Sequence, residues 1–301
     1  LQDQRTKNPN IIDQDISPFV IKGTAQPMED GDTVLLFNFR GDRAIEISQA
    51  FTDKNFKHFV KEKKPQINYW GITQYDGDEN IPPNYLVSPP LIKNTLGEHL
   101  CSLGLKQFAC SETQKFGHVS YFWNGNRSGY FDKNLEKYLE IPSDNISFDL
   151  KPWMKAHEIC EATINEMKQE SFDVGRINFP NGDMVGHTGN LDASVCAVTV
   201  VDLMVGRLLQ AAQKTNTTLI ITADHGNCEE MYLSNDKEKP KKIKTSHTLS
   251  PVPFYLYHHK KNFKNLALKV KNPSLVNIAN TVLTLMDLKT RKDYEPSLIL
   301  N

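Results

Sequence analysis

Residues 218–227, TLIITADHGN, constrain the fold more than any other segment of the chain. An apolar, β-branched run of strand length ends abruptly at Asp224, His225 and Gly226, which predicts a strand followed by a sharp turn. Parallel strands buried on both faces have this composition, and ligands bind beyond the carboxyl ends of such strands. The acid and the imidazole are therefore candidates to hold a ligand. An Asp that caps the next helix beside a hydrogen-bonded His explains the segment equally well.

The rest of the chain alternates between segments of strand and helix character, which predicts an α/β fold with a largely parallel sheet and helices on both faces. Residues 1–30 are polar and proline-containing and are expected to form an extended lead-in. Strands are expected at 31–39, 66–73, 107–111, 118–123, 173–179, 218–223 and at the end of 246–257, and helices at 44–51, 96–103, 154–169, 192–214 and 275–288.

A boundary between two domains is expected in or just after residues 76–90, which are rich in proline and turn residues. A length of 301 residues allows two domains more readily than one. The chain is accordingly divided into a first domain, 1–90, and a second domain, 91–301.

Composition excludes several classes of protein. With 39% hydrophobic and 24% charged residues the chain is too apolar for disorder, and a net charge of −1 offers no global attraction for nucleic acid or membrane. No apolar run approaches the roughly 20 residues of a membrane span. Five scattered cysteines without a CxxC pattern favour free thiols and a cytoplasmic location. Because the chain begins with Leu1 rather than Met, we expect a fragment, in which any targeting sequence would be missing.

Two further loops at predicted strand ends resemble the first in chemistry. Asp183 and His187 lie four residues apart, so that one helical turn points both the same way, and His247 precedes another strand. Carboxylate and imidazole together suit Zn, Mn or Fe, and the absence of Cys ligands argues against a structural zinc. With Asp224 and His225 the set has more ligands than one catalytic ion uses, which favours two ions. The alternative, in which each His only satisfies a local hydrogen bond, fits isolated histidines better than this group.

Basic residues form a second group of candidates. Arg40 and Arg43 flank a tight turn after the predicted strand 31–39, and guanidinium groups bind phosphate or carboxylate in a bidentate manner. Lys115 lies between the predicted strands 107–111 and 118–123, where it could reach into a cleft. The arginines alone are more typical of a solvated or salt-bridged surface.

Seven motifs occur in order along the chain: FNFRGDRA, QYDG, ACSETQKFGHV, FWNGNRSGYF, NFPNGDMVGHTGN, TADHGN and TSHTLSPVP. Together they resemble the 2,3-bisphosphoglycerate-independent phosphoglycerate mutases, from about residue 15 to the end of the chain. The NGNRSG and DYEPSLI segments are most similar to the branch found in plants and trypanosomatids.

The resemblance implies an alkaline-phosphatase-like three-layer αβα domain, with a mostly parallel sheet, next to part of an α/β phosphotransferase domain. It also implies interconversion of 3- and 2-phosphoglycerate in glycolysis and gluconeogenesis, through a phosphoserine and two Mn²⁺ (or Mg²⁺, Co²⁺ or Zn²⁺) ions but without 2,3-bisphosphoglycerate. A monomer with a small-molecule substrate, and no nucleic-acid or membrane partner, is expected. The roles it implies are one ion at Asp183, His187 and His247, the other at Asp224 and His225, substrate contacts from Arg40, Arg43 and Lys115, and a catalytic contact from Lys115.

The match departs from the family at one important point. The family's serine nucleophile and a further aspartate ligand come from an amino-terminal half that nothing here resembles, and Ser111, Ser128 and Ser246 do not stand in the nucleophile's context. We therefore expect residues 1–90 to be the last portion of the phosphotransferase domain and residues 91–301 to be a phosphatase-like domain without its first strands. Such a chain alone should be inactive.

Three alternatives remain open at the level of sequence. Another phosphohydrolase, sulfatase or phosphopentomutase of the same superfamily would share the Asp and His residues but not FNFRGDR or SETQKFGHV. A truncated, catalytically incompetent paralogue could serve as a binding module. The run DKEKPKKIK at 236–244 has five Lys in nine residues and could contact nucleic acid, but its two acids and lack of aromatics favour a solvated loop.

Overall fold

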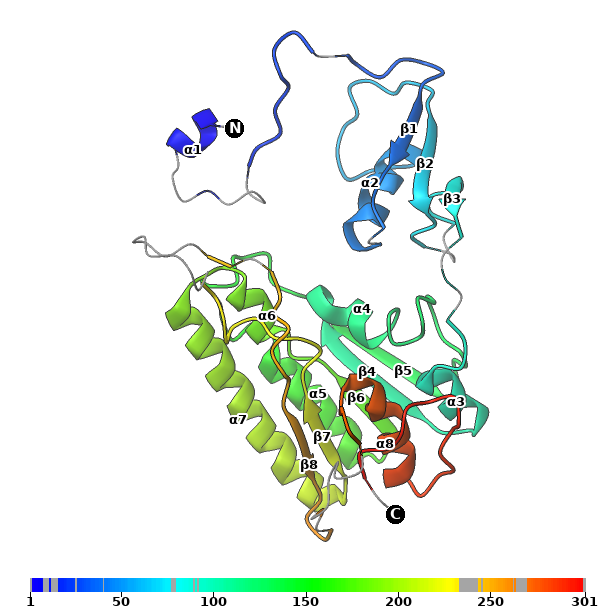
Figure 1. The fold of residues 1–301 in the computed structure, drawn as a ribbon, viewed down its shortest axis with the longest axis vertical. Coiled ribbons are helices and arrows are strands. Elements are labelled where there is room, and N and C mark those ends of the chain that lie inside the picture. The colour runs from blue at the N-terminus through cyan, green and yellow to red at the C-terminus, as the bar shows by residue number, and fades with distance from the viewer. Residues whose placement is uncertain are drawn as a thin grey trace. The chain divides into compact units, whose positions relative to one another are not determined.

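The chain divides into two compact units, Leu1–Pro89 and Pro90–Asn301, which are described separately (Figure 1). The boundary lies one residue before the predicted one, and the roles of the two domains remain predictions. This computed structural model describes residues 2–7, 11, 16–24, 26–39, 41–76, 80–88, 90, 92–232, 243–244, 246–261, 263 and 270–299, without the side chains of Asp42 and Arg43.

The first unit contains a parallel three-stranded sheet in the order β1-β2-β3, with a small core around Tyr69 and Tyr75. Phe51 of α2 stacks on Tyr69 of β2, with ring centroids 5.0 Å apart. The two predicted strands and the helix between them are confirmed, whereas α1 and β3 fall in segments predicted to be extended or linker. The elements are α1 (Gln2–Lys7), β1 (Thr33–Leu36), α2 (Asp42–Thr52), β2 (Asn68–Thr73) and β3 (Tyr85–Val87).

The second unit has two sheets, a parallel one in the order β5-β4-β6 and an antiparallel pair β7-β8. Its strands are β4 (Gln107–Glu112), β5 (Glu136–Ile141), β6 (Val174–Ile177), β7 (Leu219–Thr222) and β8 (Phe254–Tyr257). Its helices are α3 (Leu96–Ser102), η2 (Thr113–Lys115), α4 (Phe116–Val119), α5 (Ala156–Lys168), α6 (Asn181–Gly186), α7 (Leu191–Thr215), η3 (Leu275–Asn277) and α8 (Ile278–Leu285).

Strand β4 is the centre of this unit, and every one of its residues is buried. On one face Phe108 and Cys110 pack against Ile159 of α5. On the other face Gln107 Nε2 donates a hydrogen bond to the backbone oxygen of Gly97 in α3, at 3.0 Å. Since helices cover both faces, the expected three-layer αβα arrangement is confirmed.

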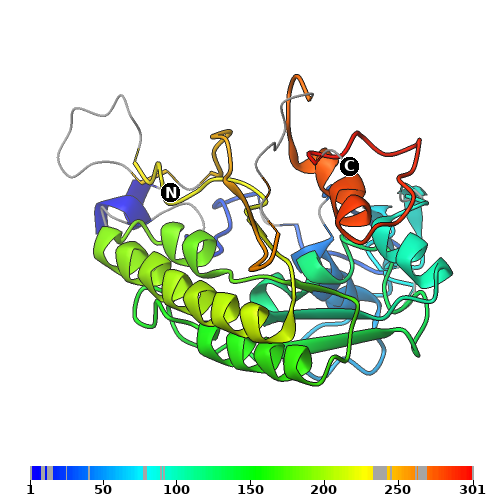
Figure 2. The same ribbon diagram turned by 90° about the horizontal axis from the view of Figure 1, so that it is seen from below.

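Helices α5 and α7 lie side by side along one face of the parallel sheet (Figures 1 and 2). Their contact is a tightly packed apolar seam in which small residues of α7 allow close approach of the helices. The seam contains Cys160, Ile164, Met167, Met204, Leu208, Ala211 and Ala212.

Two strand predictions were wrong. Residues 118–123 form the end of α4 and a series of turns, and Arg176 Nε caps the carbonyl of Val119 at 2.7 Å. The strand that pairs with β4 opposite β6 is instead β5, EKYLEI. Three of its six residues, Glu136, Lys137 and Glu140, are charged, which suits an edge strand and gave no buried-strand signal. Strand β7 was predicted to be parallel and fully buried, but it pairs antiparallel with β8 and its residues are half-buried or exposed.

Helix α7 also corrects the expectation that no segment resembles a membrane span. Among the described residues, α7 is long and apolar enough to cross a membrane by length and composition alone. The core helix of a soluble protein passes the same test. One side of α7 packs on α5, whereas Leu191, Val195, Val198 and Leu203 are exposed.

Candidate metal centre

Helix α6 brings the first two predicted ligands together. It begins a few residues after β6, and Asn181 at its start donates a buried hydrogen bond of 2.9 Å to the backbone oxygen of Pro152. Asp183 and His187 follow one helical turn apart, and the backbone N–H of His187 donates to the carbonyl of Asp183 at 3.1 Å. The predicted helical spacing therefore points both side chains to the same place.

The third ligand arrives from the segment before β8. His187 Nε2 and His247 Nε2 each lie 3.1 Å from Asp183 Oδ1, and the two nitrogens lie 3.1 Å from each other. All three candidate ligand atoms fall within 4.8 Å of one another. One carboxylate oxygen and two imidazole nitrogens converging in this way are a donor set that suits a divalent transition metal ion.

Asp224 and His225, which follow β7, lie beside this cluster. The ring of His225 stacks on that of His247, with centroids 3.6 Å apart and planes 15° from parallel. His225 Nε2 lies 3.4 Å from Asp224 Oδ2 and 4.0 Å from Asp183 Oδ2. This nitrogen is buried and has no hydrogen-bond partner among the described residues. Because an unsatisfied buried nitrogen is costly, the arrangement fits a second bound cation.

Lys115 lies between the carboxylates of Asp183 and Asp224. It ends η2, directly after the buried strand β4, and its side chain is only 6% exposed. Its Nζ lies 2.6 Å from Asp183 Oδ2 and 3.9 Å from Asp224 Oδ2. A buried ammonium group thus stands between the two predicted ligand sets.

The local electrostatics favour the ligand forms of these groups. Burial by itself raises the pKa of Asp183, but hydrogen bonds from His187, Lys115 and Asn227 and the charge of Lys115 bring it well below its usual range. Burial lowers the pKa of His247, against the opposing effect of Asp183. An ionised carboxylate and a neutral imidazole are the forms that bind metal ions.

Six of the eight predicted site residues therefore come together in the second unit: Lys115, Asp183, His187, Asp224, His225 and His247. Lys115 was expected in a loop between two strands and lies in η2 between β4 and α4. Arg40 and the side chain of Arg43 lie outside the described residues, as do residues 236–242 of the lysine-rich run.

Sequence reasoning missed one residue that touches this centre. Asn227 Nδ2 donates a hydrogen bond of 2.7 Å to Asp183 Oδ1. The available signal was its place in TADHGN, three residues after Asp224, but a buried amide in a turn has no pattern that distinguishes it from an ordinary turn residue.

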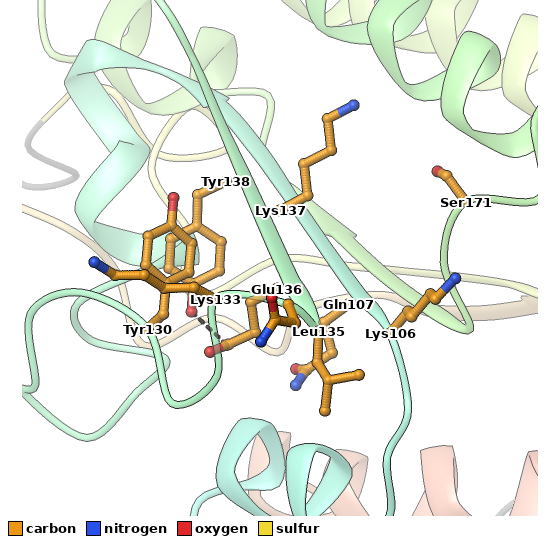
Figure 3. A pocket seen from close by; sticks show the side chains of 10 residues that line it. Lys106, Gln107, Tyr130, Lys133, Leu135, Glu136, Lys137, Tyr138 and Ser171 are labelled. Carbon is orange, nitrogen blue, oxygen red and sulfur yellow. Dashed lines mark hydrogen bonds between the residues drawn. The ribbon is translucent and has the colours of Figure 1, made fainter.

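A separate pocket of about 440 Å³ lies at the amino ends of β4 and β5, near Gln107 and Glu136 (Figure 3). Lys106, Lys133 and Lys137 line its sides, and Tyr130 stacks on Tyr138. The pocket contains none of the predicted site residues. Since Lys115 follows the carboxyl end of β4, the pocket and the metal centre belong to opposite ends of that strand.

A three-layer α/β unit with carboxylate and imidazole ligands gathered beside its strand ends is the framework of a metal-dependent α/β enzyme. Residues 16–290 match the Metalloenzyme superfamily, and the chain belongs to this family.

The chain is similar to named relatives over nearly its whole length. It is 48% identical to a protein of Leptospira interrogans named as a probable 2,3-bisphosphoglycerate-independent phosphoglycerate mutase, with 99% of this chain and 56% of the relative covered. A mutase of the same name from Trypanosoma brucei brucei is 45% identical over 98% of this chain and 56% of its own length. Mutase 1 of Arabidopsis thaliana is 45% identical, over 97% and 55%.

Among solved structures, Leishmania mexicana phosphoglycerate mutase at low cobalt concentration is similar with a TM-score of 0.93. The two are 43% identical over 99% of this chain and 57% of that chain. The chain thus spans a little more than half the length of the relatives it matches.

Proposed function

We propose that this chain forms the metal-binding and part of the substrate-binding portion of a 2,3-bisphosphoglycerate-independent phosphoglycerate mutase. The reaction is the interconversion of 3- and 2-phosphoglycerate in glycolysis and gluconeogenesis. The observation that carries the proposal is the convergence of Asp183, His187 and His247 on one point, with Lys115 linking Asp183 to Asp224. The relatives support the choice of substrate. A cytoplasmic location is part of the same proposal, because all five cysteines are free.

In this proposal Asp183, His187 and His247 hold one Mn²⁺ or equivalent ion, and Asp224 and His225 contribute to the site of a second. Bound divalent ions neutralise charge on a transferring phosphoryl group and lower the pKa of the attacking hydroxyl. Lys115 keeps Asp183 ionised and offers N–H donors to a phosphate oxygen. Arg43 and Arg40 bind the substrate's phosphate or carboxylate through their guanidinium groups.

The serine that attacks the phosphate, forming a phosphoserine, is assigned to a segment outside these 301 residues. Of the serines near the motifs, Ser111 is fully buried and donates its hydroxyl to the carbonyl of Asn178 at 3.2 Å. This pairing is typical of a structural role and supports the assignment. The isolated chain should therefore bind the ion without turning over substrate, and measurable mutase turnover by the purified chain would contradict this.

The metal centre is tested by calorimetric titration of the chain with Mn²⁺. Asp183→Asn should lower the affinity at least tenfold, because it removes the negative charge of the carboxylate that faces both imidazoles and replaces one of its oxygens with an NH2 group. Asp202→Asn, on an exposed position of α7, is the matched control and should bind as the unmodified chain does. Absence of saturable Mn²⁺ binding by the unmodified chain, or unchanged binding by Asp183→Asn, would refute the proposed centre.

A further inference from the structure

Asn227 occupies an unusual place between two of the ligand segments. It lies in the turn after β7 and is only 6% exposed, yet its side chain reaches across to α6. Nδ2 donates hydrogen bonds to Asp183 Oδ1 at 2.7 Å and to the backbone oxygen of Asp183 at 3.3 Å. One amide group therefore holds both the carboxylate of Asp183 and the helix that carries it.

Two glycines allow the segments around Asn227 to approach closely. A Cβ at Gly186, in α6, would collide with Oδ1 of Asn227. A Cβ at Gly226 would collide with both Thr248 Oγ1 and Glu229 Oε1. Close approach of these segments, rather than an unusual backbone angle, thus explains the glycines at both positions.

Glu229 fastens the same turn to the third ligand segment. Its Oε2 accepts a hydrogen bond of 2.7 Å from the backbone N–H of Asn227, and its Oε1 accepts one from the hydroxyl of Thr248. The backbone N–H of Thr248, next to His247, donates to the carbonyl of Gly226 at 3.0 Å. Although Glu229 is exposed, both of its carboxylate oxygens are engaged.

We propose that Asn227 is a positioning residue for the metal centre, and that Glu229 acts through it by holding Asn227 and Thr248 in place. The inference rests on the proposed metal-binding function. The amide directs Asp183 Oδ1 toward His187 and His247 without adding a charge or a competing metal ligand. A carboxylate at position 227 would instead stand against the carboxylate of Asp183, because an ionised acid only accepts hydrogen bonds.

The test measures Mn²⁺ affinity by calorimetry and the visible absorption spectrum of bound Co²⁺, together with the thermal midpoint of the metal-free chain. Asn227→Ala and Asn227→Asp should weaken Mn²⁺ binding about 10- to 100-fold, the usual effect of losing a residue that orients a ligand. The Co²⁺ spectrum should change as well, because its bands report the ligand geometry. A merely structural role would lower the metal-free midpoint and leave the affinity of the folded fraction unchanged, which would overturn the inference.

A second pair of variants decides the matter if the Asn227 variants do not fold. Glu229→Ala removes both acceptors at an exposed position and should weaken Mn²⁺ binding several-fold. Glu229→Gln keeps an acceptor for the N–H of Asn227 and should restore most of the affinity. Glu230, in the same turn, forms an ion pair of 3.0 Å with Lys244. Glu230→Ala, which removes this ion pair, is the matched control and should bind normally.

The outcomes distinguish failure of the proposed metal centre from failure of the positioning role of Asn227. If the unmodified chain does not bind Mn²⁺, the proposed function itself fails. If the unmodified chain binds Mn²⁺ and the Asn227 and Glu229→Ala variants bind it equally well, the metal centre stands and the positioning role of Asn227 is wrong.

Discussion

At the scale of single residues, the centre is built around the one carboxylate of Asp183. Its Oδ1 faces two imidazoles and the Asn227 amide, and its Oδ2 accepts from Lys115. Sequence could nominate Asp183 and its helical partner His187 from their spacing. The contact of Asn227 depends on how closely two segments 44 residues apart approach each other, which no local pattern encodes.

Lys115→Met should destabilise the metal-free chain by about 3 kcal/mol, because it leaves a buried carboxylate without its cation. Mn²⁺ should reduce this loss, since a bound cation supplies the missing positive charge. Urea unfolding in EDTA and in Mn²⁺ measures both values. Equal losses under the two conditions would show that Lys115 stabilises the unit independently of the metal centre.

Glu112 should make the stability of the folded chain depend on pH. Its side chain is buried at the end of β4, and burial raises its pKa, although hydrogen bonds from Ser143 and from the backbone of Lys155 oppose the shift. The folded state therefore holds this proton more tightly than the unfolded state. Its contribution to stability is complete below the unfolded pKa of about 4.3 and is lost as pH rises through the folded pKa.

Glu112→Gln retains a hydrogen-bonding side chain but does not titrate. The stability of the unmodified chain, relative to that of Glu112→Gln, should therefore decline as pH rises from about 4.3 through the raised pKa that Glu112 has in the folded state. Urea midpoints of both proteins across this range measure the difference, and the shared titration of the histidines cancels. Parallel profiles would contradict the assignment.

At the scale of elements, strand β4 could be predicted because its burial follows its sequence, and every residue of QFACSE is buried. Helix α7 could be predicted as a helix but its buried side could not, because Val195, Val198 and Leu203 are exposed whereas small residues of the same helix are buried. Strand β5 could not be predicted, since its place in the sheet comes from pairing with β4 and its composition resembles a charged loop. The prediction of a strand at 118–123 was wrong for the opposite reason. The composition of this segment resembles a strand, but its residues lie at the end of α4 and in turns.

The side of α7 that packs on α5 should contribute more to stability than the exposed side of the same helix. Leu208→Ala should cost about 2–5 kcal/mol, because Leu208 is buried in the seam and truncation leaves a cavity. Leu203→Ala, on the same helix but 58% exposed, should cost less than about 1 kcal/mol. Chemical denaturation of the two variants tests this, and similar losses would mean that the exposed side of α7 is covered in solution.

At the scale of the whole molecule, the three-layer arrangement and the grouping of six site residues in the second unit follow the sequence-based expectation. The substrate contacts predicted for Arg40 and Arg43 stay predictions, because Arg40 and the side chain of Arg43 lie outside the described residues. The chain also covers only 57% of the Leishmania mexicana mutase.

The cysteines offer a probe of the folded second unit. Burial raises the pKa of Cys110, in the central strand, to about 12 and that of Cys101 to about 11. Because the thiolate is the reactive form, both should resist a thiol reagent at pH 8 while half-buried Cys196 reacts. Mass spectrometry after brief labelling identifies the modified residues. Rapid labelling of Cys110 would show that strand β4 is not buried as described.

The ligands of the proposed centre come from three stretches of chain, and the side chains of His187 and His247 meet although 60 positions separate them. No short peptide from this protein could reproduce such a cage. Cation binding and the stability of the second unit are therefore thermodynamically linked. A substitution that destabilises the αβα layers, even far from the ligands, should weaken cation binding, and removal of the cation should lower the free energy of unfolding of this unit.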